Sequence, residues 1–250
     1  MKIDYPTQSQ MDDLRSLWQE AFRDEDAFLD LFYASGFSPD RCRCATVDGA
    51  LAAALYWFDC SFQGHHMAYL YGIATAKAFR GKGVCSALME NTHTHLKYLG
   101  YDGVILVPAD EGLFGMYGKM GYRVCASVSE FTCYAIDEPA AMHPVDTVEF
   151  CRLRREFLPE GGILQEGDSI DFLQNMADFY AGEDFLVTIY HDEKFFAPEL
   201  LGNAQSAPGI LAAMDKNQGR FRAPGGGQSF AMFHNLSDMP VPSYLGLAFD

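Results

Sequence analysis

One segment constrains the fold more than any other: an apolar run that leads through a glycine-containing loop directly into a helical pattern. The run ends near Thr75, the loop reads Arg80-Gly81-Lys82-Gly83, and apolar residues then recur at helical spacing from Val84 to Leu96. At such a strand–loop–helix junction, the first amide groups of the helix have no intrahelical acceptor and point at one spot. With the helix dipole and two basic side chains, that spot suits a phosphate. An ordinary turn with a solvated Arg and Lys is the alternative, and the glycines alone do not decide between the two.

The chain before residue 136 reads as two helices, then strands, and then an alternation of strand and helix. Two helical patterns, over residues 14–22 and 28–32, precede a hairpin signal, Asp48-Gly49, between apolar runs. A third apolar run covers residues 67–75, and the helix that follows the loop stops near Gly100. We then expect a strand at 103–107, a short amphipathic stretch at 113–120, and a strand from Tyr122 to about Ile136.

A domain boundary fits best at Asp137-Glu138-Pro139, where the composition shifts. Residues 1–135 carry 11 basic and 16 acidic side chains, net −5, whereas residues 136–250 carry 7 and 18, net −11. The second half predicts helices and strands in a mixed order. The helices are expected at 145–157, 169–180 and 208–214, and the strands at 185–190, 195–201, 220–223, 229–236 and 243–249. We therefore predict two domains, residues 1–136 and 137–250.

The net charge of −16 argues against a nucleic-acid partner, because binding to a phosphate backbone needs clustered cations. No apolar window is long enough for a membrane span, and the start of the chain has no signal-peptide pattern. The seven cysteines lack framework spacing, which favours free thiols in a reducing cytoplasm. No metal-ligand spacing is present, so we expect no metal site.

Two motifs resemble those of the GCN5-related N-acetyltransferases (the GNAT superfamily). Arg80-Gly81-Lys82-Gly83-Val84-Cys85 is similar to the family's motif A, Arg/Gln-x-x-Gly-x-Gly/Ala, which lies over the diphosphate of coenzyme A. It departs from that motif at Cys85, and Lys77 stands where a proline usually precedes the loop. Tyr117-Gly118-Lys119-Met120-Gly121-Tyr122 resembles the motif B pattern Tyr-x-Lys-x-Gly-Phe/Tyr. The resemblance covers about residues 1–135, and the second half resembles the degenerate C-terminal half of some larger bacterial members.

The resemblance implies a GNAT fold, a mixed central sheet flanked by helices with a smaller α/β domain after it, and an acetyltransferase that uses acetyl-CoA as co-substrate. A strand N–H near Ile73 or Ala74 would stabilise the oxyanion, and Tyr117 would protonate the departing thiolate. The amides of residues 81–86 would hold the diphosphate. The full set of implied coenzyme-binding residues is Ile73, Ala74, Thr75, Arg80, Gly81, Lys82, Gly83, Val84, Cys85, Ser86 and Asp110. Asp110 stands where the family often has Asn.

The acceptor and the general base are left open by the sequence. We expect a small-molecule or peptide amine, and the acidic side chains Asp24, Glu25, Asp26, Asp30 and Glu130 favour a cationic one. Candidate bases are Glu25, Asp26, Asp59, His65-His66 and the terminal carboxylate of Asp250, although most of these are expected to be ordinary surface or turn residues. The chain is expected to be a monomer or a homodimer. A non-catalytic acyl-CoA-binding module with the same fold is the alternative function.

Overall fold

The structure is a computed structural model that describes residues 1–249. Within that range the chain divides into two compact units. The first contains residues 1–106, 110–123 and 233–240, and the second contains residues 107–109, 124–232 and 241–249. Each unit contains three separate segments of the chain, so no single position divides the two units. The proposed boundary at residue 137 stays a prediction.

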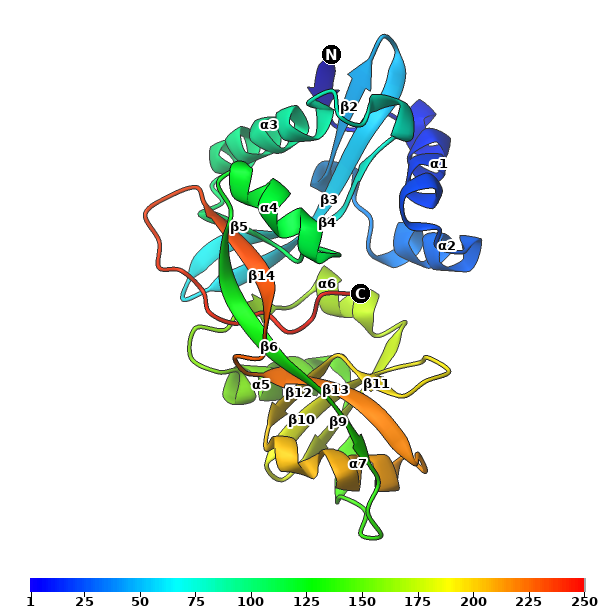
Figure 1. Ribbon diagram of the computed structural model, residues 1–250, viewed down its shortest axis with the longest axis vertical. Helices are drawn as coiled ribbons and strands as arrows, with labels where there is room; N and C mark the ends of the chain where they lie inside the picture. The colour runs from blue at the N-terminus through cyan, green and yellow to red at the C-terminus, as the bar shows by residue number, and fades with distance from the viewer. Residues whose placement is uncertain (250) are drawn as a thin grey trace. The chain divides into compact units, whose positions relative to one another are not determined.

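The first unit is a mixed sheet with helices on both faces (Figure 1). Its strands lie in the order β1 (Lys2–Asp4), β2 (Cys42–Val47), β3 (Ala50–Phe62), β4 (His65–Thr75) and β5 (Gly103–Leu106). Neighbouring strands are antiparallel except for β4 and β5, which are parallel. The β2–β3 turn has positive φ at both Asp48 and Gly49, which confirms the predicted hairpin.

Helices α1 (Met11–Phe22) and α2 (Asp26–Ser35) lie on one side of strands β2–β4, and α3 (Val84–Tyr98) lies on the other (Figure 1). The apolar stripe of α1 buries Leu14, Leu17 and Trp18, and that of α3 buries Leu88, Met89 and Leu96. Helix α4 (Glu111–Lys119) follows β5 and carries the first residues of motif B, Tyr117 to Lys119. The short helices η1 (Gln8–Gln10), η2 (Pro39–Arg41) and η3 (Lys77–Phe79) connect these elements.

In the second unit, β6 (Arg123–Tyr134) lies between β14 (Gln228–Asn235) and β13 (Gln218–Pro224), and β11 (Phe196–Ala197) is at the edge. A small antiparallel sheet has the order β12 (Glu199–Gly202), β10 (Phe185–Tyr190), β9 (Ala177–Gly182) and β7 (Met142–Pro144). The remaining elements are α5 (Thr147–Phe157), β8 (Leu164–Gln165), α6 (Asp168–Leu173), η4 (Ala204–Ser206) and α7 (Ala207–Ala213).

Three predicted elements of the second half were wrong. The helix expected at 169–180 ends at Leu173, because residues 177, 179 and 181 are buried in alternation and form β9 instead. The strand expected at 195–201 is divided at Pro198, which cannot donate to a ladder. Residues 243–249 form no strand, and Tyr244 makes only an isolated bridge to Gly162 within the described chain.

No helix in residues 1–249 is long and apolar enough to cross a membrane.

Candidate functional site

The second half of β4 has an open edge. Strand β4 is paired with β3 along nearly its whole length, but its parallel register with β5 covers only Met67 to Tyr69. From Leu70 to Thr75, the backbone on the β5 side has no strand partner within residues 1–249. Backbone donors and acceptors on this edge are therefore available to an extended ligand.

A bulge in β4 lies at the start of this open edge. The β3–β4 register changes between Ala54, which opposes Ala74, and Tyr56, which opposes Tyr71, so β4 contains one extra residue. Gly72 at the bulge has φ +58°, and a Cβ there would lie 2.4 Å from the Trp18 ring. Only glycine allows both this backbone conformation and the close approach of Trp18. An isolated glycine inside an apolar run is the sequence signal that could have revealed the bulge.

Helix α3 begins with its first amide groups uncapped. Gly83 is the N-cap residue, with φ 78° and ψ 2°, and its carbonyl accepts from Ala87 (3.0 Å). No side chain caps the helix, so the amides of Val84, Cys85 and Ser86 have no intrahelical acceptor. A Cβ at Gly83 would meet nothing within 4 Å, so the space beside the N-cap residue is open. This geometry is that of an anion site at a helix of 15 residues.

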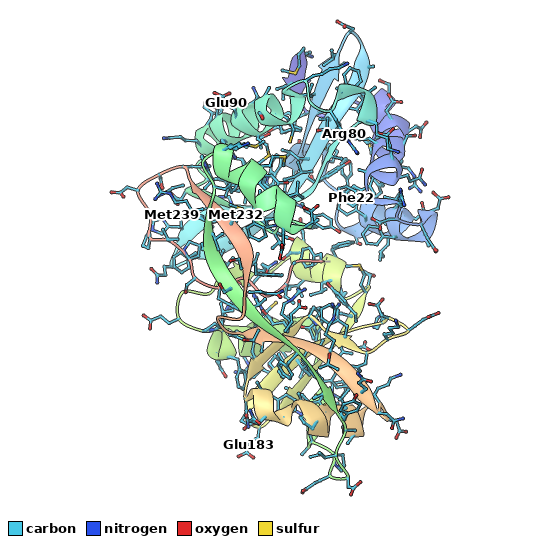
Figure 2. The ribbon with its side chains drawn as sticks, in the orientation of Figure 1. Phe22, Arg80, Glu90, Glu183, Met232 and Met239 are labelled. Carbon is cyan, nitrogen blue, oxygen red and sulfur yellow. The ribbon has the colours of Figure 1, made fainter. Side chains whose placement is uncertain are left out.

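The two basic residues of the loop have no acidic partner within residues 1–249. Arg80 lies in the loop before α3 (Figure 2), and its Nε donates to the carbonyl oxygen of Thr75 (2.9 Å). This bond fixes the guanidinium beside the end of β4. Lys82 is exposed, and its Nζ lies 5.6 Å from the centroid of the Phe79 ring. Both charges therefore add positive potential at the start of α3.

The open edge, the helix start and motif B meet at one group of side chains. Burial raises the pKa of the Cys85 thiol, and a polar interaction with the side chain of Thr75 opposes the rise. Burial raises the pKa of Tyr117 well above its usual value, and the nearby Cys85 and Asp110 act in the same direction. The end of β4, the first turn of α3 and the last turn of α4 thus converge around Tyr117.

Tyr117 is 5% exposed, and its hydroxyl has no hydrogen-bond partner within residues 1–249. Its ring meets that of Tyr122 edge-on, with centroids 5.8 Å apart. Because its pKa is raised, the hydroxyl keeps its proton throughout the neutral range and is available as a donor.

Asp110 caps α4. Its Oδ1 accepts from the amide of Leu113 (3.2 Å), and the side chain is exposed. It therefore has a local structural task, and a contact with the coenzyme stays a prediction.

The candidate bases lie in different surroundings. Asp59 contacts Arg41, His66 and Tyr101, at a position of β3 that opposes Ala68 rather than the end of β4. His65 lies 3.2 Å from the carboxylate of Asp102. The structure brings neither histidine together with Tyr117.

The acidic residues of α1 and α2 are partly paired. Asp26 and Asp30 contact Arg15, and Asp24 accepts from Nε1 of Trp18 (2.7 Å). Glu25 is exposed at the N-cap of α2, without a capping hydrogen bond.

Two further candidates remain. Glu130, in the second unit, contacts both Arg222 and Arg220. Asp250 lies outside the described residues.

No group of three or more His, Cys, Asp or Glu side chains in the described chain is placed to hold a metal ion.

Comparisons with known proteins give one family match and many structural matches. A profile described as "Acetyltransferase (GNAT) domain" matches residues 2–125. No curated protein sequence matches the chain. A GCN5-related N-acetyltransferase from Kribbella flavida has a TM-score of 0.70 at 18% identity, over 93% of this chain and 70% of that one. A GCN5-related N-acetyltransferase from Anabaena variabilis ATCC 29413 has a TM-score of 0.76 at 16% identity, over 94% of this chain and 73% of that one. A putative acetyltransferase from Pyrococcus horikoshii has a TM-score of 0.64 at 14% identity, over 94% of this chain and 89% of that one.

The structural matches confirm the predicted mixed α/β GNAT fold, with a large mixed sheet and a second small antiparallel sheet. The profile match covers both motifs and every element that forms the site. Residues 2–125 of this chain therefore form an acetyltransferase domain of the GCN5-related N-acetyltransferase (GNAT) family.

Proposed function

We propose that the first unit transfers the acetyl group of acetyl-CoA directly to an amine, with Tyr117 as the general acid. The observation that carries this proposal is the convergence of the open edge of β4, the uncapped start of α3 and the protonated hydroxyl of Tyr117. The open edge of β4 suits an extended pantetheine arm, and the uncapped start of α3 suits a diphosphate. The hydroxyl of Tyr117 suits the protonation of a departing thiolate.

The residues have separate tasks in the proposed reaction. The open edge of β4 holds the pantetheine arm, and the amides of residues 81–86 with Arg80 and Lys82 hold the diphosphate. The neutral amine attacks the acetyl carbonyl, and an N–H of β4 near Ile73 or Ala74 stabilises the oxyanion. As the C–N bond forms and the C–S bond breaks, the amine loses a proton to a base or water, and Tyr117 gives one to sulfur.

The acceptor we propose is a cationic amine. Exposed carboxylates on α1 and α2, Glu25 among them, supply negative potential in the same unit as the site. Such a field attracts a cation, and an acidic group nearby can help to remove its proton.

The test combines binding with turnover. Calorimetry of the full chain with CoA should give a stoichiometry near one, because the sequence contains one glycine loop of the motif A type, at residues 80–83. Incubation with acetyl-CoA and a panel of amines should raise the mass of at least one amine by one acetyl group. Binding without transfer to any amine would favour the non-catalytic acyl-CoA-binding module, and absence of binding would refute both.

A further inference from the structure

One side chain connects the acidic turn between α1 and α2 to the bulge of β4. Trp18 of α1 is 2% exposed, and its Nε1 donates to Oδ2 of Asp24 in the turn (2.7 Å). The far edge of the same ring lies against Gly72, because a Cβ added there would collide with the ring atoms Cζ3 and Cη2. The indole therefore contacts the turn at one end and the bulge at the other.

The bulge contains the backbone on which the proposed reaction depends. The β3–β4 register leaves Leu55 opposite two residues of β4, Gly72 and Ile73. Gly72 has no side chain to hold this irregular backbone, and the ring of Trp18 occupies the space where one would lie. A donor to an oxyanion must lie 2.7–3.1 Å from it, so a small shift of the bulge alters the stabilisation that the Ile73 amide can give.

The hydrogen bond to Asp24 supplies the directional contact that orients the ring. The rings of Phe32, Tyr56 and Tyr71 pack around Trp18, with centroid distances of 4.7, 5.3 and 5.5 Å. Such packing excludes water, whereas the indole N–H is the one polar group of the ring and prefers a nearly linear approach to its acceptor. Loss of this acceptor would therefore leave a buried donor unpaired and allow the ring to tilt.

The carboxylates of the turn have different surroundings. Oδ1 of Asp26 accepts from Nε2 of Gln19 on α1 (2.7 Å), so a second hydrogen bond holds the turn on the helix. The carboxylate of Glu25, between them, makes no hydrogen bond or ion pair within residues 1–249. Asp24 is thus engaged with the protein itself, whereas Glu25 is available to a cation.

We propose that Trp18 is a positioning residue for acetyl transfer, oriented by Asp24, and that its ring holds the bulge so that the amide of Ile73 lies where the oxyanion forms. The inference rests on the proposed function, because the oxyanion donor is assigned there. It gives Asp24 a task other than attraction of the acceptor, which was the task expected from the acidic sequence of the turn.

The test separates the hydrogen bond of Asp24 from its charge. Steady-state kinetics of the full chain would use acetyl-CoA and the panel amine that the wild type acetylates fastest. Asp24→Ala and Trp18→Phe should each lower kcat by about tenfold or more, because both release the bulge. Asp24→Asn keeps an acceptor oxygen and should retain kcat within about twofold. Calorimetry should show CoA affinity within about twofold of the wild type in all three, because the start of α3 is unchanged.

Two further variants complete the comparison. Trp18→Phe combined with Asp24→Ala should lower kcat no further than the larger single loss, because both changes remove one connection. Asp13→Ala is the control, since Asp13 is an exposed carboxylate in the first turn of the same helix, and it should change neither kcat nor CoA affinity. Thermal unfolding of each variant would show which of them are folded, and the two Asp24 variants decide the matter if Trp18→Phe does not fold.

Two results would overturn the inference while the wild type is active. One is an equal effect of Asp24→Asn and Asp24→Ala, confined to the KM of the amine, which would show that Asp24 acts only through its charge. The other is a kcat in Asp24→Ala within about twofold of the wild type. If the wild type transfers acetyl to no amine, the proposed function fails, and this inference fails with it.

Discussion

At the scale of single residues, burial decides whether a titratable side chain is protonated or deprotonated at neutral pH. Tyr117 is buried beside Cys85 and Asp110, and all three influences raise its pKa. His93 is buried beside His234, and both influences lower its pKa. The tyrosine therefore stays a proton donor at neutral pH, whereas the histidine stays uncharged.

Replacement of Tyr117 by Phe should lower kcat and leave the affinity for acetyl-CoA nearly intact. Loss of a general acid costs on the order of 10²–10⁴ in rate. Steady-state kinetics and calorimetry on the same preparation would measure the two quantities. A fall in kcat below about threefold would show that water or another group protonates the thiolate.

The free energy of unfolding should fall in acid because of His93. Its pKa in the folded state is about 3, below the value near 6.5 expected in the unfolded chain, so the unfolded state binds a proton first as pH falls. Stability is therefore retained above about pH 6.5 and declines below it, by about 2 kcal/mol at pH 5. Urea unfolding at pH 7 and pH 5 would measure the change, and His93→Gln should reduce it. An equal loss in that variant would contradict this assignment.

At the scale of elements, the start of α3 depends on backbone conformation rather than on packing. Gly83 has a left-handed φ, and the space around it is open. A side chain there is strained by this backbone conformation.

Gly83→Val should abolish detectable CoA binding, because the branched side chain obstructs the anion site. Gly64→Val is a matched control: Gly64 has φ +85°, nothing within 4 Å of its Cβ, and a place in the β3–β4 turn. The control shares the backbone strain but should keep its affinity for CoA. Calorimetry and thermal unfolding of both variants would separate obstruction from strain. Unchanged affinity in Gly83→Val would exclude the loop as the diphosphate site.

A buried ion pair joins two elements of the second unit. Arg154 of α5 is fully buried and donates to both carboxylate oxygens of Glu199, at 2.7 and 3.0 Å. The hydroxyl of Tyr244 donates to the same carboxylate at 3.1 Å, and a Cβ at Gly246 would collide with it. The pair therefore fixes the chain around residues 244–246, which contains no strand.

Glu199→Gln should lower the free energy of unfolding by about 3–5 kcal/mol, because the Arg154 charge is then buried without its counter-charge. Glu156→Gln is the control, since Glu156 is the exposed partner of Arg152 on the same helix. Its effect should stay within about 1 kcal/mol. Urea unfolding would measure both, and similar small losses in the two variants would show that Arg154 finds another acceptor.

At the scale of the whole molecule, charge is the property that bears on the acceptor. The chain carries 34 acidic and 18 basic side chains. The loop with Arg80 and Lys82 lies directly before α3. A net negative field raises the rate of encounter with cations and lowers it for anions.

The specificity constant for a polyamine acceptor should therefore fall as ionic strength rises past about 0.15 M, where the Debye length is about 8 Å. A neutral amine, measured in parallel, should show little dependence on salt. Initial rates in increasing NaCl would test this. A best acceptor that is anionic, with rates independent of salt, would leave the net charge without a role in substrate choice.

The local parts of the candidate site could be predicted from short stretches of sequence. The glycine loop, the helix start at Val84 and the placement of Tyr117 on α4 all follow from contiguous residues, because amide orientation and side-chain spacing depend on neighbours in the chain. The same reasoning predicted the Asp48-Gly49 hairpin correctly.

Tertiary structure decided what depends on partners far apart in the chain. The open edge of β4 exists because its pairing with β5 stops at Tyr69, and no pattern within β4 states where a partner strand ends. Only the first part of the helix expected at 169–180 forms, as α6, and its last part belongs to β9 because a neighbouring strand, β10, pairs with it. His93 and His234 stack only because the fold brings β14 to α3. Burial, pairing and long-range contact are properties of the assembled chain, and local sequence encodes them only in part.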